Sequence, residues 1–146
     1  MRTPGSFLSV AAVFLFAAFV AANEEAQDIE DRIWQLRTEA RYDEARELSR
    51  TLIAALTDDA EVLQHEVDDA RRLAETLDRV AGLPEDARSE LARADAMMPA
   101  LAELWDEARY SEGLEIARRQ LAIRRNFLGE VSPDVSESLN ELGLFL

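Results

Sequence analysis

Cysteine and lysine are both missing from the 146 residues of this chain. Without cysteine there is no disulfide, no thiolate metal ligand, no thiol nucleophile and no site for bacterial lipoprotein lipidation. Glycine and proline are scarce, at 5 and 4 residues, and no stretch alternates between apolar and polar residues as a half-buried strand would. Alanine, leucine, glutamate and arginine dominate instead, and all four favour helices. The composition therefore predicts an all-α protein.

Positive charge is also in short supply. The 16 basic residues, all of them arginine, are outnumbered by 30 acidic ones, and the net charge is −14. Phosphate backbones and anionic membrane surfaces repel such a chain, and no basic stripe offsets the repulsion. We expect no nucleic-acid partner, and we expect contact with a membrane only if an apolar N-terminal segment is retained.

That apolar segment is a continuous run over residues 7–22, after a single positive charge at Arg2. The run is shorter than the ~20 residues that a membrane-spanning helix needs. Ala22, with Val20 two positions before it, fits the site at which a signal peptidase cleaves. We interpret residues 1–22 as a signal peptide, which predicts an exported protein, periplasmic or secreted. The alternative is an uncleaved segment that anchors the chain in a membrane by residues 7–22.

From Asn23 onward, apolar residues recur every three or four positions, which is typical of amphipathic helices. Gly82-Leu83-Pro84 and Pro99 interrupt this pattern, because proline is poorly tolerated inside a helix. We divide this part of the chain into 23–82, a diverged helical hairpin plus a long helix, and 83–146, a helical linker followed by repeat-like sequence. The predicted helices cover residues 24–40, 43–56, 60–81, 85–95, 100–109, 111–127 and 134–146.

The tetrapeptide EARY occurs twice, at residues 39–42 and 107–110, which are 68 positions apart. Both copies fall in the predicted turn between two amphipathic helices, where the tyrosine would pack across both helices. A small residue follows three positions after each tyrosine, Ala45 in one copy and Gly113 in the other, and would let the second helix approach the first closely. The spacing is twice the tetratricopeptide length of about 34 residues. The pattern predicts two copies of one helical unit.

The second copy leads into ARYSEGLEIARRQLAIRRNFLGEVSPDVSESLNELGLFL, residues 108–146, which resembles the kinesin-light-chain type of tetratricopeptide repeat (TPR). The segment before it resembles the region that precedes the repeats in large bacterial TPR proteins. The matching positions are Arg109, Tyr110, Glu112, Leu114, Leu121, Ile123, Arg124, Leu128, Gly129, Pro133, Asp134, Val135, Ser138, Leu139, Asn140 and Leu142.

The resemblance implies antiparallel helix hairpins that stack into a short α-solenoid, an extended loop at residues 129–133, and a scaffold for protein–protein interaction. It implies a protein or peptide partner held in a groove lined by the first helices of the hairpins, with no enzymatic activity and no cofactor. Three positions depart from the family pattern. Gly113 and Gln120 replace alanines, and Ser132 replaces a histidine. Gln120 places an amide where close helix packing is expected.

The last predicted helix would leave apolar side chains partly uncovered. Its sequence, LNELGLFL, resembles the first helix of a further repeat, and a single repeat cannot bury its apolar face alone. Three alternatives remain: the helix packs back on the body, it pairs with another copy to form a homo-oligomer, or the chain is a truncated fragment of a larger TPR protein without independent activity. The residues concerned are Leu139, Leu142, Phe145 and Leu146.

Candidate contacts for the partner are Trp105, Arg118 and Arg119. The two arginines belong to a cluster with Arg124 and Arg125 that could bind a peptide carboxylate through two parallel hydrogen bonds. Such arginines are more often paired with neighbouring acids. Exposed aromatic side chains can also contact a peptide, although core packing is the commoner role for them. The aromatic candidates are Trp34, Tyr42, Trp105 and Tyr110.

No motif for catalysis is present in the sequence. His65 is the only histidine, and on a helix it would share a face with Glu61 and Asp69. Three such ligands could hold a metal ion and support a hydrolase, but no fourth ligand accompanies them. We interpret His65 as an exposed histidine among acids, and we expect no metal site, no cofactor and no catalytic residue.

Overall fold

A computed structural model describes residues 25–58 and 62–146. Within these ranges all regular structure is helical, which confirms the all-α class for this part of the chain. The predicted signal peptide lies outside the described residues. None of the helices found within the described ranges is both long and apolar enough to cross a bilayer. The helices are residues 25–38, α2 (Tyr42–Asp58), α3 (Gln64–Ala81), α4 (Glu85–Asp95), α5 (Met98–Asp106), α6 (Tyr110–Leu128) and α7 (Pro133–Leu144).

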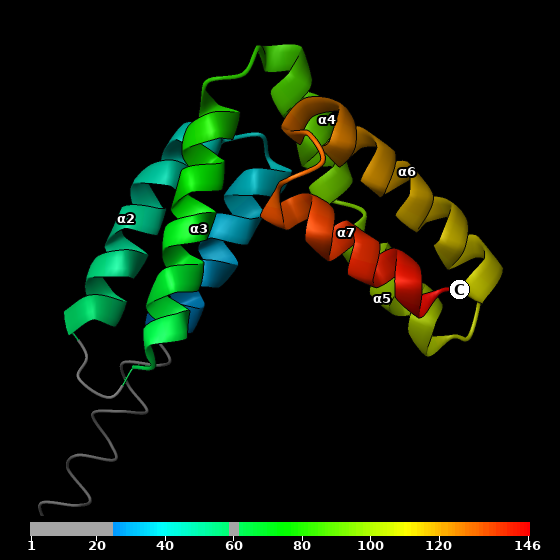
Figure 1. Ribbon diagram of the computed structural model, residues 1–146, viewed down its shortest axis with the longest axis horizontal. Coiled ribbons are helices and arrows are strands. Elements are labelled where there is room, and N and C mark those ends of the chain that lie inside the picture. Colours follow the sequence, from blue (N-terminus) through cyan, green and yellow to red (C-terminus); the bar gives the residue numbers. More distant parts are fainter. Residues whose placement is uncertain (1–24, 59–61) are drawn as a thin grey trace, which may run out of the picture.

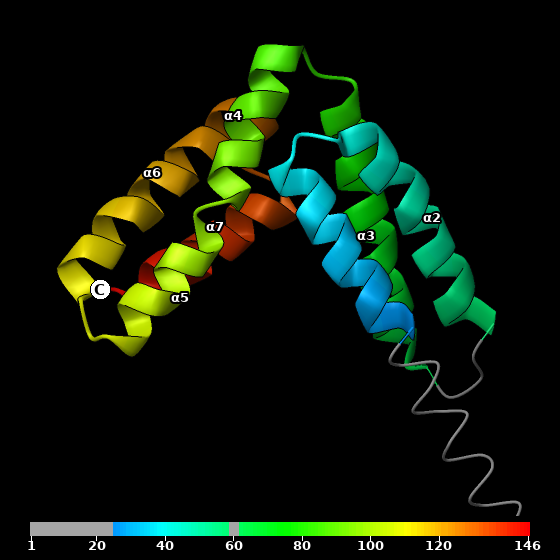
Figure 2. The same cartoon turned by 180° about the vertical axis from the view of Figure 1, so that it is seen from behind.

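The helices form two arms that meet at an angle (Figures 1 and 2). The first arm contains the helix over residues 25–38 together with α2 and α3. The second arm contains α4, α5, α6 and α7. The chain crosses from one arm to the other once, between α3 and α4, at the Gly82-Leu83-Pro84 turn that the sequence predicts.

Local signals account for the helix boundaries. α4 has the predicted bounds, and Pro99 lies in the first turn of α5, where its missing N–H is not needed. α3 begins at Gln64 rather than at the predicted residue 60. The Glu66 carboxylate accepts a hydrogen bond from the Leu63 backbone N–H at 3.1 Å, which stabilises this later start.

The two EARY turns have the same backbone. Ala40 and Ala108 adopt positive φ angles of 58° and 56°. The next N–H donates back to the helix in each copy, from Arg41 to the Leu36 carbonyl and from Arg109 to the Leu104 carbonyl, both at 2.9 Å. This is the Schellman geometry, in which a left-handed residue ends a helix. Each arginine also pairs with two glutamates, Glu39 and Glu44 in one copy and Glu107 and Glu112 in the other.

The correspondence between the arms extends through their cores at the same offset of 68 residues. In both arms a helix leads into the EARY turn, a second helix follows it, and a third helix packs against the second. The pairs of buried residues at equivalent positions are Ile33 and Leu101, Leu36 and Leu104, Ala45 and Gly113, Ser49 and Ala117, Leu52 and Gln120, Leu56 and Arg124, Val67 and Val135, Ala70 and Ser138, and Leu77 and Phe145. The chain therefore contains one three-helix unit twice.

Each arm has two different ends. The turn end carries the EARY turn. The open end is where the second helix of the unit stops and its third helix begins. In the first arm the open end lies near Leu56 and His65, and in the second arm it lies near Arg124 and Asp134.

The last helix packs back on the second arm, which is one of the three alternatives left open by the sequence. Phe145 is buried against α6 at Gly113, where an added methyl group would lie 2.7 Å from the ring Cζ and closer still to two other ring atoms. Gly113 therefore accommodates the Phe145 ring. Three apolar side chains at this end of the chain stay exposed: Leu139, Leu144 and Leu146.

Candidate functional site

A buried ionic cluster joins the two arms. Arg37, near the end of the 25–38 helix, donates from Nε and Nη2 to the Asp95 carboxylate at 2.9 and 3.0 Å. Its Nη2 also lies 2.9 Å from the Asp134 carboxylate. Arg124 donates to Asp95 at 2.9 Å from the other side. All four residues are at most 8% exposed, and their two positive and two negative charges balance.

Three polar side chains complete the cluster. The Gln120 amide donates to the Ala94 carbonyl at 3.0 Å and accepts a hydrogen bond from the Ser138 hydroxyl at 3.2 Å. The Tyr42 hydroxyl lies 3.4 Å from the Asp95 carboxylate. Gln120, which departs from the family pattern, is thus fully buried with partners for both ends of its amide. The cluster holds the arms together alongside apolar contacts, since Leu91 and Ala92 of α4 share a core with Leu36 of the first arm.

Two groups of the cluster, Arg37 and Tyr42, have pKa values raised away from neutral pH. Burial lowers the pKa of Arg37, but Asp95 and Asp134 together raise it above its ordinary value. Burial raises the pKa of the Tyr42 hydroxyl, and the Asp95 charge raises it further. Because neither group exchanges a proton near neutral pH, the cluster is suited to holding the arms in place rather than to acid–base chemistry.

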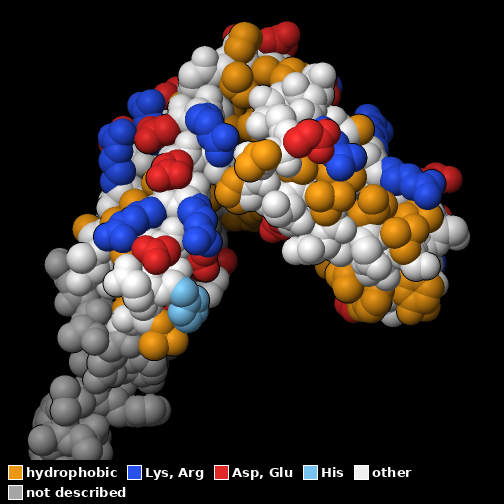
Figure 3. Space-filling view, in the orientation of Figure 1, with side chains coloured by type: hydrophobic (Ala, Val, Ile, Leu, Met, Phe, Trp, Pro, Cys, Tyr) orange, Lys and Arg blue, Asp and Glu red, His pale blue; other side chains and the backbone are white. Residues whose placement is uncertain are grey.

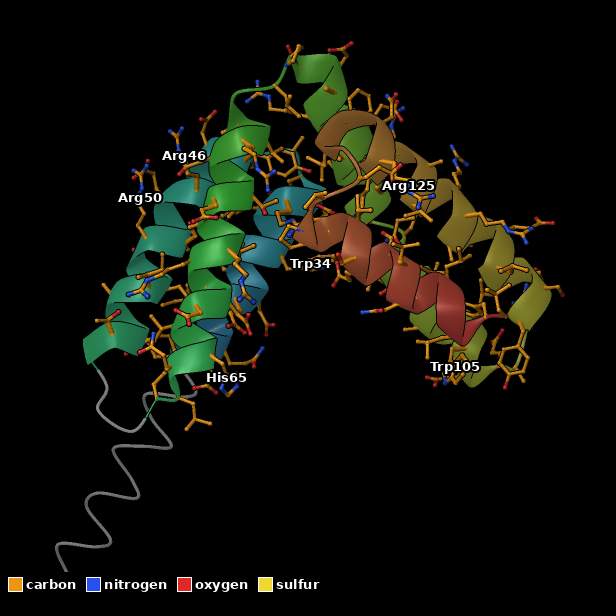
Figure 4. All side chains as sticks on the ribbon, viewed as in Figure 1. Trp34, Arg46, Arg50, His65, Trp105 and Arg125 are labelled. Carbon is orange, nitrogen blue, oxygen red and sulfur yellow. The ribbon has the colours of Figure 1, made fainter. Side chains whose placement is uncertain are left out.

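A groove runs along the inner side of the angle between the arms. It encloses about 870 Å³ and is lined by the 25–38 helix, α3, α7 and the residues just before α7. Figure 3 shows this side of the molecule hollowed between the arms, and Figure 4 shows Trp34 on it. Trp34 is half-buried, and the Arg37 guanidinium lies 5.4 Å from the centre of its ring.

The groove combines apolar surface with charged and polar side chains. Thr76 and Ser132 also contribute to its lining, but both are buried, and their hydroxyls form no hydrogen bond within the described part of the protein. Val131 stands at its edge and is 93% exposed. Arg72 and Glu137 supply charges of both signs. Such a surface suits an extended peptide, which presents side chains and backbone polar groups together.

The three predicted contact residues lie on a different part of the molecule. Trp105 is 42% exposed at the end of α5, beside Tyr110 and Phe145. It lines a mainly apolar hollow of about 380 Å³, which Arg118 and Arg119 do not line. Those two arginines are exposed on α6. The structure therefore does not bring Trp105 and the arginines into one cavity, and none of the three lines the groove between the arms.

The predicted arginine cluster does not exist as one surface patch. Arg124 is fully buried in the junction, and Arg125 pairs with Glu130 at 3.0 Å. The reason is the helix period. Arg124 is three to four residues from the buried Gln120 and Leu121, so it points inward with them.

The junction residues were missed because their pairing is long-range. A signal was present, however. The equivalent positions in the first arm hold Leu52 and Leu56, so polar residues at positions 120 and 124 stand where the repeat expects apolar ones. Buried polar residues of this kind need partners from another element.

No group of three metal-ligating side chains gathers within residues 25–58 and 62–146. His65 is exposed, and its predicted neighbour Glu61 lies outside the described residues. In comparisons with protein-family models, with curated proteins and with solved structures, nothing matched this chain.

Proposed function

We propose that this chain is a non-enzymatic interaction module of TPR type that binds a segment of a partner protein in the groove between its arms. The observation that carries the proposal is the groove itself, about 870 Å³ of mixed apolar and polar surface with a half-buried tryptophan. A volume of this size accommodates a short stretch of polypeptide.

The arrangement of the helices supports the same proposal. In a TPR solenoid the first helices of successive hairpins line the binding face, as the resemblance of residues 108–146 implies. Here the 25–38 helix, which is the first helix of its hairpin, lines the groove together with α3 and α7, the helices that follow the hairpin in each arm. The junction cluster holds both walls in a fixed relation, and a preformed groove loses less free energy to ordering when a peptide binds.

A peptide-selection experiment tests the proposal. The chain has two tryptophans, so a Trp105→Phe variant retains Trp34 as the single fluorescent reporter in the groove. Random peptides displayed on phage are selected against the chain, synthesised, and titrated while the Trp34 emission is recorded. We expect saturable binding that shifts this emission.

Two matched variants locate the binding site. Ser136→Arg with Asn140→Arg adds bulk at two exposed positions that line the groove and leaves the core unchanged. Arg118→Glu with Arg119→Glu changes the exposed face of α6. We expect the first pair to weaken peptide binding at least tenfold and the second to leave it unchanged. The reverse result would place the binding site on the α6 face. Equal peptide binding by all variants would contradict binding in the groove.

Export is part of the same proposal and has its own test. If residues 1–22 are a signal peptide, the protein produced in a bacterial host accumulates outside the cytoplasm and begins at Asn23. Mass spectrometry of the purified protein measures the N-terminus directly. A retained N-terminus in the membrane fraction would favour the alternative, an anchor formed by residues 7–22.

A further inference from the structure

The contact between the arms joins two unlike surfaces. The turn end of the first arm contributes Arg37 and Tyr42, and the open end of the second arm contributes Asp95, Arg124 and Asp134. Since both arms are copies of one unit, each has a turn end and an open end. Among residues 25–58 and 62–146, the turn end of the second arm and the open end of the first arm have no such counterpart.

The unused turn end is aromatic and exposed. Trp105 occupies the position of Arg37, and Tyr110 occupies that of Tyr42. Arg37 and Tyr42 are 6% and 1% exposed, whereas Trp105 and Tyr110 are 42% and 47% exposed. The Trp105 and Tyr110 rings lie against each other, with 5.4 Å between their centroids. Figure 3 shows hydrophobic side chains gathered at this far end of the second arm.

The unused open end is a hollow with a buried apolar base and a polar rim. Leu52 is fully buried and Leu56 is 7% exposed, whereas Gln27, Glu66 and Asp69 are exposed. The hollow encloses about 510 Å³, and Figure 4 marks this end of the first arm by His65, which lines it. Five of its lining residues occupy positions equivalent to residues of the junction. The residues Gln27, Leu52, Leu56, Glu66 and Ala70 stand where the second arm has Asp95, Gln120, Arg124, Asp134 and Ser138.

The residues at the two unused ends differ from their equivalents in the junction, and they differ on both surfaces. In the junction a buried arginine meets a wall of carboxylates and amides. At the unused ends a tryptophan replaces the arginine, and leucines replace the glutamine and arginine of the wall. The junction combines its charges with apolar packing, since Leu91 and Ala92 of α4 belong to the core of the first arm. The free ends offer an exposed aromatic pair on one surface and a hollow with buried leucines at its base on the other.

We propose that a second copy of this chain docks on the open end of the first arm, with Trp105 and Tyr110 entering the hollow beside Leu52 and Leu56. The contact repeats between molecules the junction that each molecule already contains. It is head to tail, because the two docking surfaces are different, so it generates open chains or rings rather than a closed twofold dimer. The hollow and the groove assigned to the partner peptide share two lining residues, Asp69 and Leu73 of α3.

Acidic side chains surround both docking surfaces. Asp106, Glu107 and Glu112 accompany a single arginine, Arg109, at the turn end, and Glu30, Glu66 and Asp69 line the open end. Like charges therefore oppose the approach at low ionic strength, and added salt screens them. We expect association to strengthen as salt rises, which is the opposite of the behaviour of an interface built on ion pairs.

Complementation between two variants tests the proposal on the full chain. Trp105→Glu blocks the turn end, and Leu56→Arg gives the open end the residue found at the equivalent position of the junction. Sedimentation velocity is measured at about 1 M salt, where charges are screened beyond roughly 3 Å. Association through residues 7–22 would be common to all samples and would not respond to either substitution.

We expect concentration-dependent association of the unaltered chain, loss of that association in each variant alone, and dimers that grow no further in an equimolar mixture of the two. The mixture retains one intact turn end and one intact open end. The proposal is overturned if the unaltered chain stays monomeric at the highest concentration at which it dissolves, if Trp105→Glu associates as the unaltered chain does, or if the mixture fails to restore dimers.

Cysteine crosslinking keeps the proposal testable if Leu56→Arg does not fold, which circular dichroism would reveal. The chain has no cysteine of its own. Asp106→Cys and Gln27→Cys place single thiols at the exposed rims of the two surfaces, and Arg118→Cys on α6 is the control. Oxidation of the first two together should give a mixed disulfide in clear excess over any pairing with the control. Equal yields would exclude the proposed contact.

Discussion

Arg37 and Asp95, 58 residues apart in the chain, form an ion pair through two parallel hydrogen bonds of 2.9 and 3.0 Å in the buried junction between the arms. The pair connects the last turn of the 25–38 helix to the last residue of α4. Arg124 and Asp134 close the cluster, and Arg124 also pairs with the half-exposed Glu137 at 3.0 Å. Removal of the Asp95 charge leaves two buried arginines facing only Asp134 and Glu137.

Asp95→Asn should therefore destabilise the fold by about 3–5 kcal/mol, the range typical of a broken buried ion pair. Urea denaturation followed by circular dichroism measures the change. Asp69→Asn is the matched control, since Asp69 pairs with Arg72 at 3.0 Å where both side chains are about two-thirds exposed, at 65% and 66%. We expect almost no effect from the control. Similar effects from both substitutions would mean that the junction does not hold the arms together.

The two EARY turns predict a pair of stabilising substitutions. Ala40 and Ala108 hold φ angles of 58° and 56°, a region that costs an L-residue about 1–2 kcal/mol and costs glycine almost nothing. Ala40→Gly and Ala108→Gly should each raise the free energy of unfolding by about 0.5–1 kcal/mol, after the greater entropy of glycine in the unfolded chain is deducted. Ala122→Gly, at an exposed position inside α6, should instead lower the free energy of unfolding by about 1 kcal/mol. Opposite signs in thermal melts would confirm the turn geometry.

Gly113 and Phe145 should show strong coupling. Gly113→Ala places a methyl group inside the volume of the Phe145 ring, so the ring must leave its site. We expect a net loss of about 1–2 kcal/mol, because the loss of Phe145 burial outweighs the gain in helix propensity. In a Phe145→Ala background the clash is absent, and Gly113→Ala should then stabilise the protein by about 0.8–1 kcal/mol. If Gly113→Ala changed the free energy of unfolding with the same sign in both backgrounds, the packing of Phe145 against Gly113 would be contradicted.

Glu141 supplies a pH-dependent prediction. Burial raises the pKa of its carboxyl above the ordinary value, Glu137 raises it further, and Arg124 opposes them. One carboxyl oxygen, Oε2, has no hydrogen-bond partner among the described residues. A raised folded-state pKa means that the protonated form favours folding, and that this contribution is lost as the pH rises above the unfolded value of about 4.3.

Glu141→Gln should therefore melt at a higher temperature than the unaltered chain at pH 7. The difference should shrink as the pH falls and vanish at about pH 3, well below the unfolded pKa, where the glutamate is protonated in both the folded and the unfolded states. Thermal melts at several pH values measure this. A difference that persists unchanged at low pH would show that the effect of the substitution is not electrostatic.

Much of the local structure was readable from the sequence. α4 was predicted with its observed bounds, and the other helices within a few residues, because helix periodicity and the stops at glycine and proline act over one or two turns. The repeated EARY was also recognised as a turn between helices. Its tyrosines, however, were expected to play one role. Tyr42 is buried in the junction, and Tyr110 is 47% exposed.

The sequence by itself determined the helical class, the helix boundaries and the repetition of one unit, because each follows from residues close together in the chain. Only the tertiary structure decided which surfaces of that unit meet. The Arg37–Asp134 contact spans 97 residues, and its partners become neighbours only when the arms pack. Local propensity carries no information about such a contact. The groove between the arms and the two unused ends follow from the same packing, so neither could be read from the sequence.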